Sequence, residues 1–246
     1  MPLLFSPVNQ EELRHAYTPR PRCAFLMLHQ GEAVDPAEHT IGRIVREVLG
    51  ARRFTAITAG DVRRTSDFLH KIVDLIRGTG FSIAIFSDRT PPKTLANIFF
   101  EIGVALILGK PVHLIWAAQE PGSTAVPSDF VRTEWIRFIG DEDRLRRDLG
   151  TAFDATIEGA IYYRETGDIA FEAVEPDLEL AFERYKQAIL ISGNSEDRAR
   201  IVQVRDRLAL ADRRRRADAE MATHRARLLQ AVREFLALLP REMAGA

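Results

Sequence analysis

Short apolar runs alternate with helix-like segments between residues 23 and 116, and this alternation constrains the fold more than any other feature. Four runs have the length of strands: Cys23–Leu28, Arg53–Thr58, Phe81–Phe86 and Val112–Trp116. Three segments between them have the apolar spacing or the composition of helices: 41–49, 68–76 and 95–108. Strands and helices that alternate in this way are typical of a parallel sheet with helices on both faces. We therefore expect an α/β domain built on a parallel sheet.

The C-terminal part of the chain has a different pattern. Residues 196–239 contain no glycine or proline. Large apolar residues recur there in two series with steps of three and four: Ile201, Val204 and Leu208, then Leu228, Val232, Phe235 and Leu239. Such steps predict a helical hairpin or a coiled-coil arm. Because a lone hairpin would expose these stripes to water, we expect this region to form a homo-oligomer.

The chain of 246 residues is long enough for one α/β domain of ordinary size and a smaller second part. Four prolines in the first 22 residues, at positions 2, 7, 19 and 21, argue against regular structure there. The predicted organisation is an N-terminal arm over 1–22, an α/β domain over 23–165 and a helical oligomerisation or interaction domain over 176–246.

Charge and cysteine content narrow the class of partner and the compartment. The net charge is −1, from 34 basic and 35 acidic residues, which does not indicate a nucleic-acid partner. The single cysteine, Cys23, excludes an intrachain disulfide framework and fits a reducing environment. The first residues lack the pattern of a signal peptide, and no apolar run approaches the length of a membrane span. We therefore expect a cytoplasmic protein without a membrane partner.

The strongest functional signal lies directly after the third strand. That strand ends at Ser87 and Asp88, and a Pro-Pro turn leads into a helix that carries Asn97 and Glu101. The helix is otherwise apolar on every side, so we expect it to be buried. Residues four apart share one face of a helix. A carboxylate in an apolar helix is costly unless it is paired or functional, and ligands of open α/β sheets bind at the carboxyl ends of strands. We therefore predict that Asp88, Asn97 and Glu101 line a small polar pocket; the alternative for Glu101 is an ion pair with a buried arginine or lysine.

Several common sites are excluded by their missing motifs. No G-x-G-x-x-G follows the first strand, no phosphate-binding loop opens a helix, and no G-x-S-x-G occurs. The six histidines and one cysteine show no metal-ligand spacing, so we expect no bound metal. His29 follows the first strand and either reaches the pocket or is a solvated loop residue. The run Arg213–Arg216 is either a phosphate-binding patch or the solvated face of a charged helix.

The segment Asn97–Ile115, NIFFEIGVALILGKPVHLI, resembles the signature NVFYELG-A-ALGKPV-LI of prokaryotic TIR-like proteins. The same signature runs through the related nucleoside 2-deoxyribosyltransferase-like proteins. Ala24–Leu28, Asp35 and the segment 61–76 fit the same pattern, so the resemblance covers about residues 23–116. Its most specific part is Asn97–Pro111. The fold that it implies is a TIR-like form of the flavodoxin-like sheet.

In this superfamily a carboxylate that matches Glu101 attacks or stabilises the anomeric carbon of a ribosyl group. Polar residues on neighbouring loops hold the sugar hydroxyls. The resemblance thus implies a catalytic Glu101 and five substrate-binding candidates: Asn97, Asp88, Asp61, His29 and Met27.

The implied activity is hydrolysis of an N-ribosidic bond in NAD+ or in a nucleoside or nucleotide. NAD is then a possible substrate, and no cofactor is required. The resemblance also implies a defence or signalling effector that assembly activates. Two other readings stay open: a non-catalytic TIR-like module that senses a nucleotide or serves as a scaffold, and a helical adaptor with a vestigial α/β domain.

Overall fold

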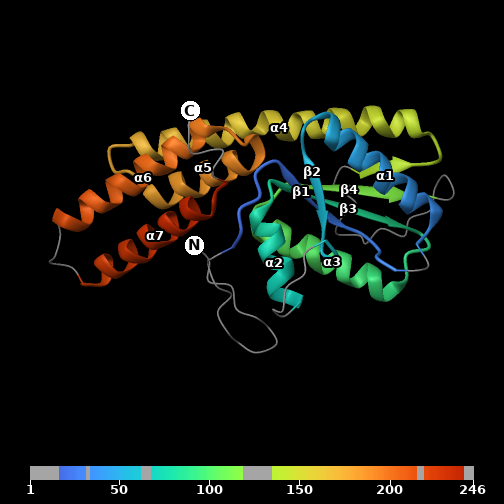
Figure 1. Ribbon diagram of the computed structural model, residues 1–246, viewed down its shortest axis with the longest axis horizontal. Coiled ribbons are helices and arrows are strands. Elements are labelled where there is room, and N and C mark those ends of the chain that lie inside the picture. Colours follow the sequence, from blue (N-terminus) through green and yellow to red (C-terminus); the bar gives the residue numbers. More distant parts are fainter. Residues whose placement is uncertain (1–16, 32–33, 62–67, 119–134, 215–218, 241–246) are drawn as a thin grey trace. The chain divides into compact units, whose positions relative to one another are not determined.

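The computed structural model describes residues 17–31, 34–61, 68–118, 135–214 and 219–240 of the chain (Figure 1). The chain divides into two compact units: residues 22–156, here called the sheet unit, and residues 1–21 with 157–246, called the helical unit. The boundary falls inside α4 (Glu142–Glu172), which is one continuous helix. It therefore lies earlier in the chain than the predicted domain limit at residue 165.

Among the described residues, five parallel strands form one sheet in the order β2-β1-β3-β4-β5. The strands are β1 (Cys23–Met27), β2 (Thr55–Thr58), β3 (Phe81–Ser87), β4 (Val112–Ala117) and β5 (Trp135–Phe138). Every residue of the central strand β3 is buried, which agrees with its nearly unbroken apolar sequence. The expectation of an α/β protein with a parallel sheet is confirmed, and this topology is consistent with a flavodoxin-like fold.

Helices cover both faces of the sheet (Figure 1). The sheet unit contains α1 (Pro36–Ala51), α2 (Phe68–Gly78), α3 (Pro92–Ile107) and the first part of α4. Successive side chains of a strand point to opposite faces: Phe86 lies in an apolar cluster with residues of α2 and α3. Ser87 instead bonds to the first turn of α1 and its cap. Phe153 of α4 lies on the α1 face, where its ring contacts Phe81 of β3.

The order of the strands defines where a ligand would be expected. The chain leaves β1 toward β2 on one side, and it leaves β3 toward β4 on the other side. β1 and β3 are neighbours, so the direction of winding changes between them. In open α/β sheets this switch point, outside the carboxyl ends of the strands, is the usual place for a ligand. The predicted residues Met27, His29 and Asp88 all lie at or just after these two strand ends.

Two features of α3 differ from prediction. The helix begins at Pro92 rather than Leu95, because proline is well suited to the first turn of a helix. The helix is also not buried on every side. Phe100, Leu106 and Ile107 are 48%, 53% and 72% exposed, so the prediction of a fully buried helix is wrong. An apolar composition alone does not determine whether a second layer covers the outer face.

The bounds of two strands can also be compared with the prediction. β2 begins at Thr55 rather than Arg53, because Arg53 has a positive φ of 59° and forms a turn before the strand. The sequence of residues 130–139 also predicts a short edge strand or turn. β5 occupies Trp135–Phe138 at the edge of the sheet, and the earlier part of that range lies outside the described residues.

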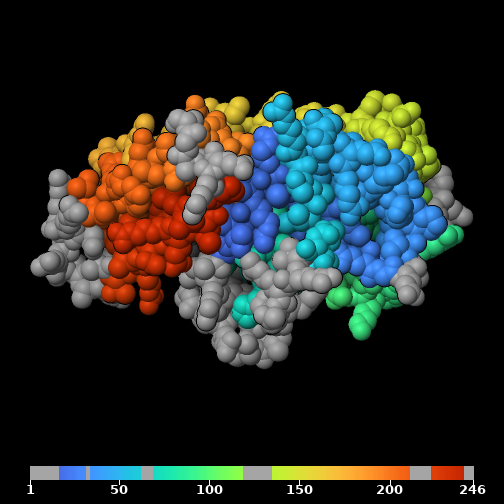
Figure 2. Space-filling view, in the orientation of Figure 1, coloured from blue at the N-terminus to red at the C-terminus, as the bar shows by residue number. Residues whose placement is uncertain are grey.

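The helical unit consists of residues 157–172 of α4, then α5 (Leu178–Ser192), α6 (Ser195–Arg214) and α7 (Ala219–Leu238). α5 packs on α6, and α6 packs on α7, so the last two helices lie side by side (Figure 2). Asp177 caps α5 by accepting a hydrogen bond from the Leu180 amide, and Gly193 ends the helix with a left-handed residue. Within the described residues, no helix combines the length and apolar character needed to cross a bilayer.

The apolar stripes of α6 and α7 are covered within the unit. Leu208, Val232 and Phe235 are 2%, 0% and 4% exposed, and they share one core with α5. Tyr17 from the N-terminal part of the unit packs against the same core. The argument that a lone hairpin must expose these stripes was therefore wrong, because it left out α5 and its neighbours. Homo-oligomerisation through residues 176–246 stays a prediction, without that reason to support it.

Gly167 lies where α4 meets α5. A Cβ at this position would lie 2.6 Å from Cε1 of the Tyr185 ring, which is 1% exposed and has little room to move. We expect Gly167→Ala to lower the free energy of unfolding by about 1–3 kcal/mol, as overpacking does, although alanine favours helices. Gly159→Ala is the matched control in the same helix, because a Cβ there meets nothing within 4 Å. It should raise the stability by about 0.5–1 kcal/mol. Urea unfolding measures both, and a stabilising Gly167→Ala would contradict this packing.

Candidate functional site

Glu101 lies on the buried face of α3. The other buried residues of that helix are Ile98, Ile102 and Ala105, which belong to the apolar cluster beneath α3. The Glu101 side chain is 9% exposed. It has no hydrogen bond or ion pair within the described part of the chain, so the alternative of a buried arginine or lysine partner is not observed there. A buried carboxyl group without a compensating partner is costly, and such groups occur where function requires them.

Burial raises the pKa of the Glu101 carboxyl group to about 7. The cause is desolvation, which disfavours the charged form, and no cation in the described part of the chain opposes it. At neutral pH the group therefore exists as a mixture of the protonated and the ionised form. A carboxyl group in this condition accepts or releases a proton readily, and its negative charge is strengthened by the poorly solvated surroundings.

This pKa predicts how stability depends on pH. The folded value, about 7, lies above the ordinary value of 4.5, so the folded protein binds the proton more tightly than the unfolded chain. Stability should therefore fall as the pH rises from about 4.5 through 7. Relative to Glu101→Gln, which carries no charge, the wild type should lose up to about 3 kcal/mol over this window. Urea unfolding of both proteins at several pH values measures the difference, and parallel pH profiles would contradict the prediction.

Met27 and Asp88 lie on the same face of the sheet as α3. Met27 is 1% exposed and packs in the cluster that contains Ile98 and Ile102. Trp116 of β4 belongs to that cluster, and its Nε1 donates a hydrogen bond of 3.1 Å to Oδ1 of Asp88. Asp88 is exposed, so this bond orients a solvent-accessible carboxylate. Sequence reasoning missed Trp116, although a buried indole at a strand end usually needs an acceptor.

The other three predicted residues have different surroundings. The Asn97 side chain is exposed and has no hydrogen bond within the described residues, so no side-chain contact there joins it to Glu101. His29 is partly buried, and its buried Nδ1 atom has no hydrogen-bond partner among the described residues. Asp61 closes the turn after β2, where its Oδ2 accepts bonds of 2.7 Å and 2.8 Å from the amide and hydroxyl of Thr58. Asp61 thus stabilises that turn.

A second polar cluster lies on the opposite face, at the switch point between β1 and β3. Ser87 Oγ lies 3.0 Å from Oδ2 of Asp35 and 2.7 Å from Oε1 of Glu38. Thr90 Oγ1 donates to the same Glu38 oxygen and accepts a bond of 2.7 Å from the Ser87 amide. All four side chains are buried, and Oε2 of Glu38 has no hydrogen-bond partner in the part of the chain that the structure describes.

This cluster fixes the link between β3 and α3. Asp35 is also the N-cap of α1, through a 2.9 Å bond from the Ala37 amide. The link is therefore bonded to α1 on one face of the sheet and, through Asp88, to Trp116 on the other. Sequence reasoning noticed Asp35 only as part of a family pattern and did not connect it with Ser87, Thr90 and Glu38, the other members of the cluster. The available signal was a Ser-Asp-Arg-Thr turn after a buried strand.

Among the described residues, no group of three or more His, Cys, Asp or Glu side chains is arranged to hold a metal ion. The chemistry that the site offers is therefore that of carboxyl groups, an amide and an imidazole. No protein-family model matches this chain, and no curated protein is similar to it.

Proposed function

We propose that the sheet unit cleaves an N-ribosidic bond, in NAD+ or in a nucleoside or nucleotide, with Glu101 as the reacting carboxylate. The observation that carries this proposal is the isolation of Glu101: a 9% exposed glutamate with no partner in the described residues, on the helix that follows the switch-point strand. The reaction that we propose for this carboxylate is the one implied by the resemblance of Asn97–Ile115 to TIR-like and deoxyribosyltransferase-like proteins.

Breaking a ribosyl C–N bond develops positive charge on the anomeric carbon. A carboxylate beneath the sugar stabilises that charge or forms a covalent bond to the carbon, which water then cleaves. In poorly solvated surroundings this attraction is stronger than in water. The nicotinamide of NAD+ already carries a positive charge, so it leaves without a general acid. An ordinary nucleobase requires one, and His29 and Asp88 are the candidates at the same edge of the sheet.

The proposal is tested by product analysis of the full-length protein. Samples are incubated with NAD+ and with a panel of nucleosides and nucleotides, and free base is quantified by chromatography. Release of nicotinamide or of a nucleobase supports the proposal and identifies the leaving group. Binding of a nucleotide without turnover, measured by calorimetry, would instead favour a nucleotide-sensing module. If assembly activates the protein, as the resemblance implies, the specific rate should rise with protein concentration.

Asn97 lies one turn before Glu101 and is proposed to bind a ribose hydroxyl. Since Asn97 is exposed and makes no hydrogen bond within the described residues, Asn97→Ala should change the stability by less than about 0.5 kcal/mol. Loss of one hydrogen bond to the sugar should lower kcat/KM about tenfold, since such bonds contribute about 1–1.5 kcal/mol. Steady-state kinetics together with thermal unfolding measure both quantities. A variant that unfolds would show that Asn97 is structural.

A further inference from the structure

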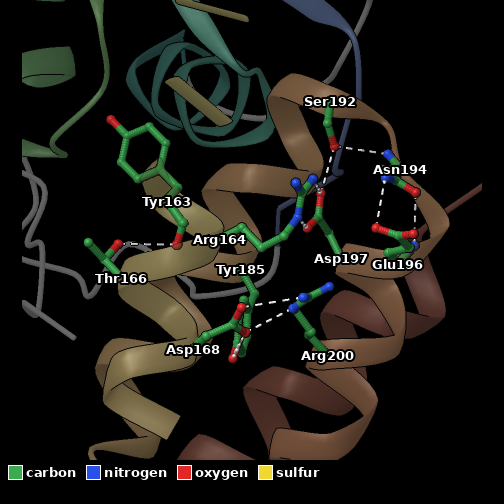
Figure 3. Close-up of polar contacts among 10 residues, drawn as sticks. All are labelled: Tyr163, Arg164, Thr166, Asp168, Tyr185, Ser192, Asn194, Glu196, Asp197 and Arg200. Carbon is green, nitrogen blue, oxygen red and sulfur yellow. Dashed lines mark hydrogen bonds and ion pairs between the residues drawn. The ribbon is translucent and has the colours of Figure 1, made fainter. Parts of the chain in front are cut away.

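The part of α4 in the helical unit has one face that packs against α5 and α6. Gly167 and Ala170 are buried, and Gly167 lies against the ring of Tyr185. Arg164 and Asp168 extend toward α6, where each forms an ion pair (Figure 3). These contacts define the inner face of α4 within the helical unit.

The opposite face of the same helix carries exposed apolar side chains. Ile161, Tyr162 and Ile169 are 52%, 58% and 71% exposed. At about 100° per residue, these three positions fall within an arc of about 100° that lies roughly opposite Gly167. Isolated exposed apolar residues are common, but several that gather on one helix face mark an interaction surface.

A row of glutamates runs between these apolar residues. Glu158, Glu165 and Glu172 are spaced by seven residues, and all three are exposed. A seven-residue spacing keeps side chains nearly in line along a helix, and this row is about 21 Å long. None of the three has a hydrogen bond or an ion pair within the described residues. The row therefore offers three acceptors to a partner along the length of the exposed apolar residues.

We propose that this surface, called the α4 stripe (Ile161, Tyr162, Ile169 and the three glutamates), binds an amphipathic helix of another protein. That helix would carry lysine or arginine at seven-residue intervals between two apolar rows. Such a helix complements the stripe in charge and shape, and two helices packed along their length bury the apolar groups of both. This inference is independent of the proposed catalytic function.

The negative charge of the stripe disfavours three other partners: a second copy of the stripe, a nucleic acid and an anionic membrane surface. A symmetric contact between two copies of the stripe would place glutamates near glutamates, which costs free energy. Nucleic acids and anionic membrane surfaces carry the same sign of charge as the stripe and would be repelled. A basic helix is the partner for which the charge and the apolar contacts act together.

The test uses the full-length protein and a synthetic helical peptide of about three heptads, with leucine on both sides of an arginine row. Fluorescence polarisation measures its affinity. Glu165→Lys on the stripe should weaken binding by about tenfold or more. Glu175→Lys is the matched control, because this exposed glutamate lies outside the stripe and its side chain also has no hydrogen bond or ion pair within the described residues. It changes the net charge equally and should weaken binding less than about threefold.

The apolar part of the stripe has its own matched pair. Ile169→Ser should weaken peptide binding, whereas Leu210→Ser on α6, which is 54% exposed, should not. Failure of the peptide to bind, or an equal loss in stripe and control variants, would overturn the proposal. Light scattering of the same variants tests whether the stripe instead binds a second copy of this chain. Self-association that Glu165→Lys abolishes would show that the stripe binds a second copy, which also overturns the proposal.

Discussion

Glu101→Gln is expected to lower the rate of base release by about a thousandfold or more, with the fold intact. Glutamine keeps the shape of the side chain and removes the charge that would stabilise a developing ribosyl cation. Because the wild-type carboxylate is buried without a partner, the same change should not destabilise the protein above pH 7. Activity is measured as free base per enzyme, and stability by urea unfolding at pH 8.

The combination of the two results separates a functional carboxylate from a structural one. Substitution of a structural glutamate would lower the stability of the protein. Substitution of a catalytic glutamate lowers the rate of base release, whereas the stability is unchanged or higher. Glu175→Gln is the control, since this exposed glutamate lies in the helical unit. It should leave both rate and stability unchanged. Near-wild-type turnover in Glu101→Gln would refute a catalytic role for this carboxylate.

The pH dependence of the rate then reveals which form of Glu101 reacts. With a group whose pKa is about 7, the rate should rise with pH through neutrality if the carboxylate form is required. It should fall if the protonated form acts as a general acid. The first profile fits NAD+, whose leaving group needs no proton, and the second fits a nucleobase that must be protonated.

Local patterns were sufficient to predict the parallel sheet and the burial of Glu101. β3 is buried throughout because a parallel strand between two helical layers must be apolar on both sides, and its sequence shows this directly. Glu101 was predicted because one acid interrupts an apolar helix, which is visible within a single segment. Both inferences depend only on neighbours in the chain.

Contacts between distant segments could not be predicted in this way. Trp116 bonds to Asp88, 28 residues away, and Ser87 bonds to Asp35, 52 residues away. Nothing in either short segment specifies its partner, since many polar residues would serve. The burial of the stripes around Leu208 and Val232 was missed for a related reason. Periodicity shows that a helix face needs cover, but it does not show which element provides that cover.

The second large effect is expected in the helical unit, at Asp197. This carboxylate is fully buried and bonds to Arg164 through Nε at 2.7 Å and Nη2 at 3.1 Å (Figure 3). Ser192 donates a further bond of 2.7 Å. Asp197→Ala would leave the largely buried Arg164 without its partner; the hydrogen bonds that the guanidinium donates to this carboxylate raise the pKa of Arg164. We expect the free energy of unfolding to fall by about 3–5 kcal/mol.

A second ion pair between the same two helices provides the control. Arg200 and Asp168 also join α6 to α4, but their side chains are 28% and 34% exposed. Because water screens this pair and Asp168 keeps its bond from the Tyr185 hydroxyl, Arg200→Ala should cost only about 1 kcal/mol. The double variant Asp197→Ala with Arg164→Met should recover part of the loss, since it removes the unpaired charge as well. Equal losses in Asp197→Ala and Arg200→Ala, measured by urea unfolding, would show that burial does not set the strength of these contacts.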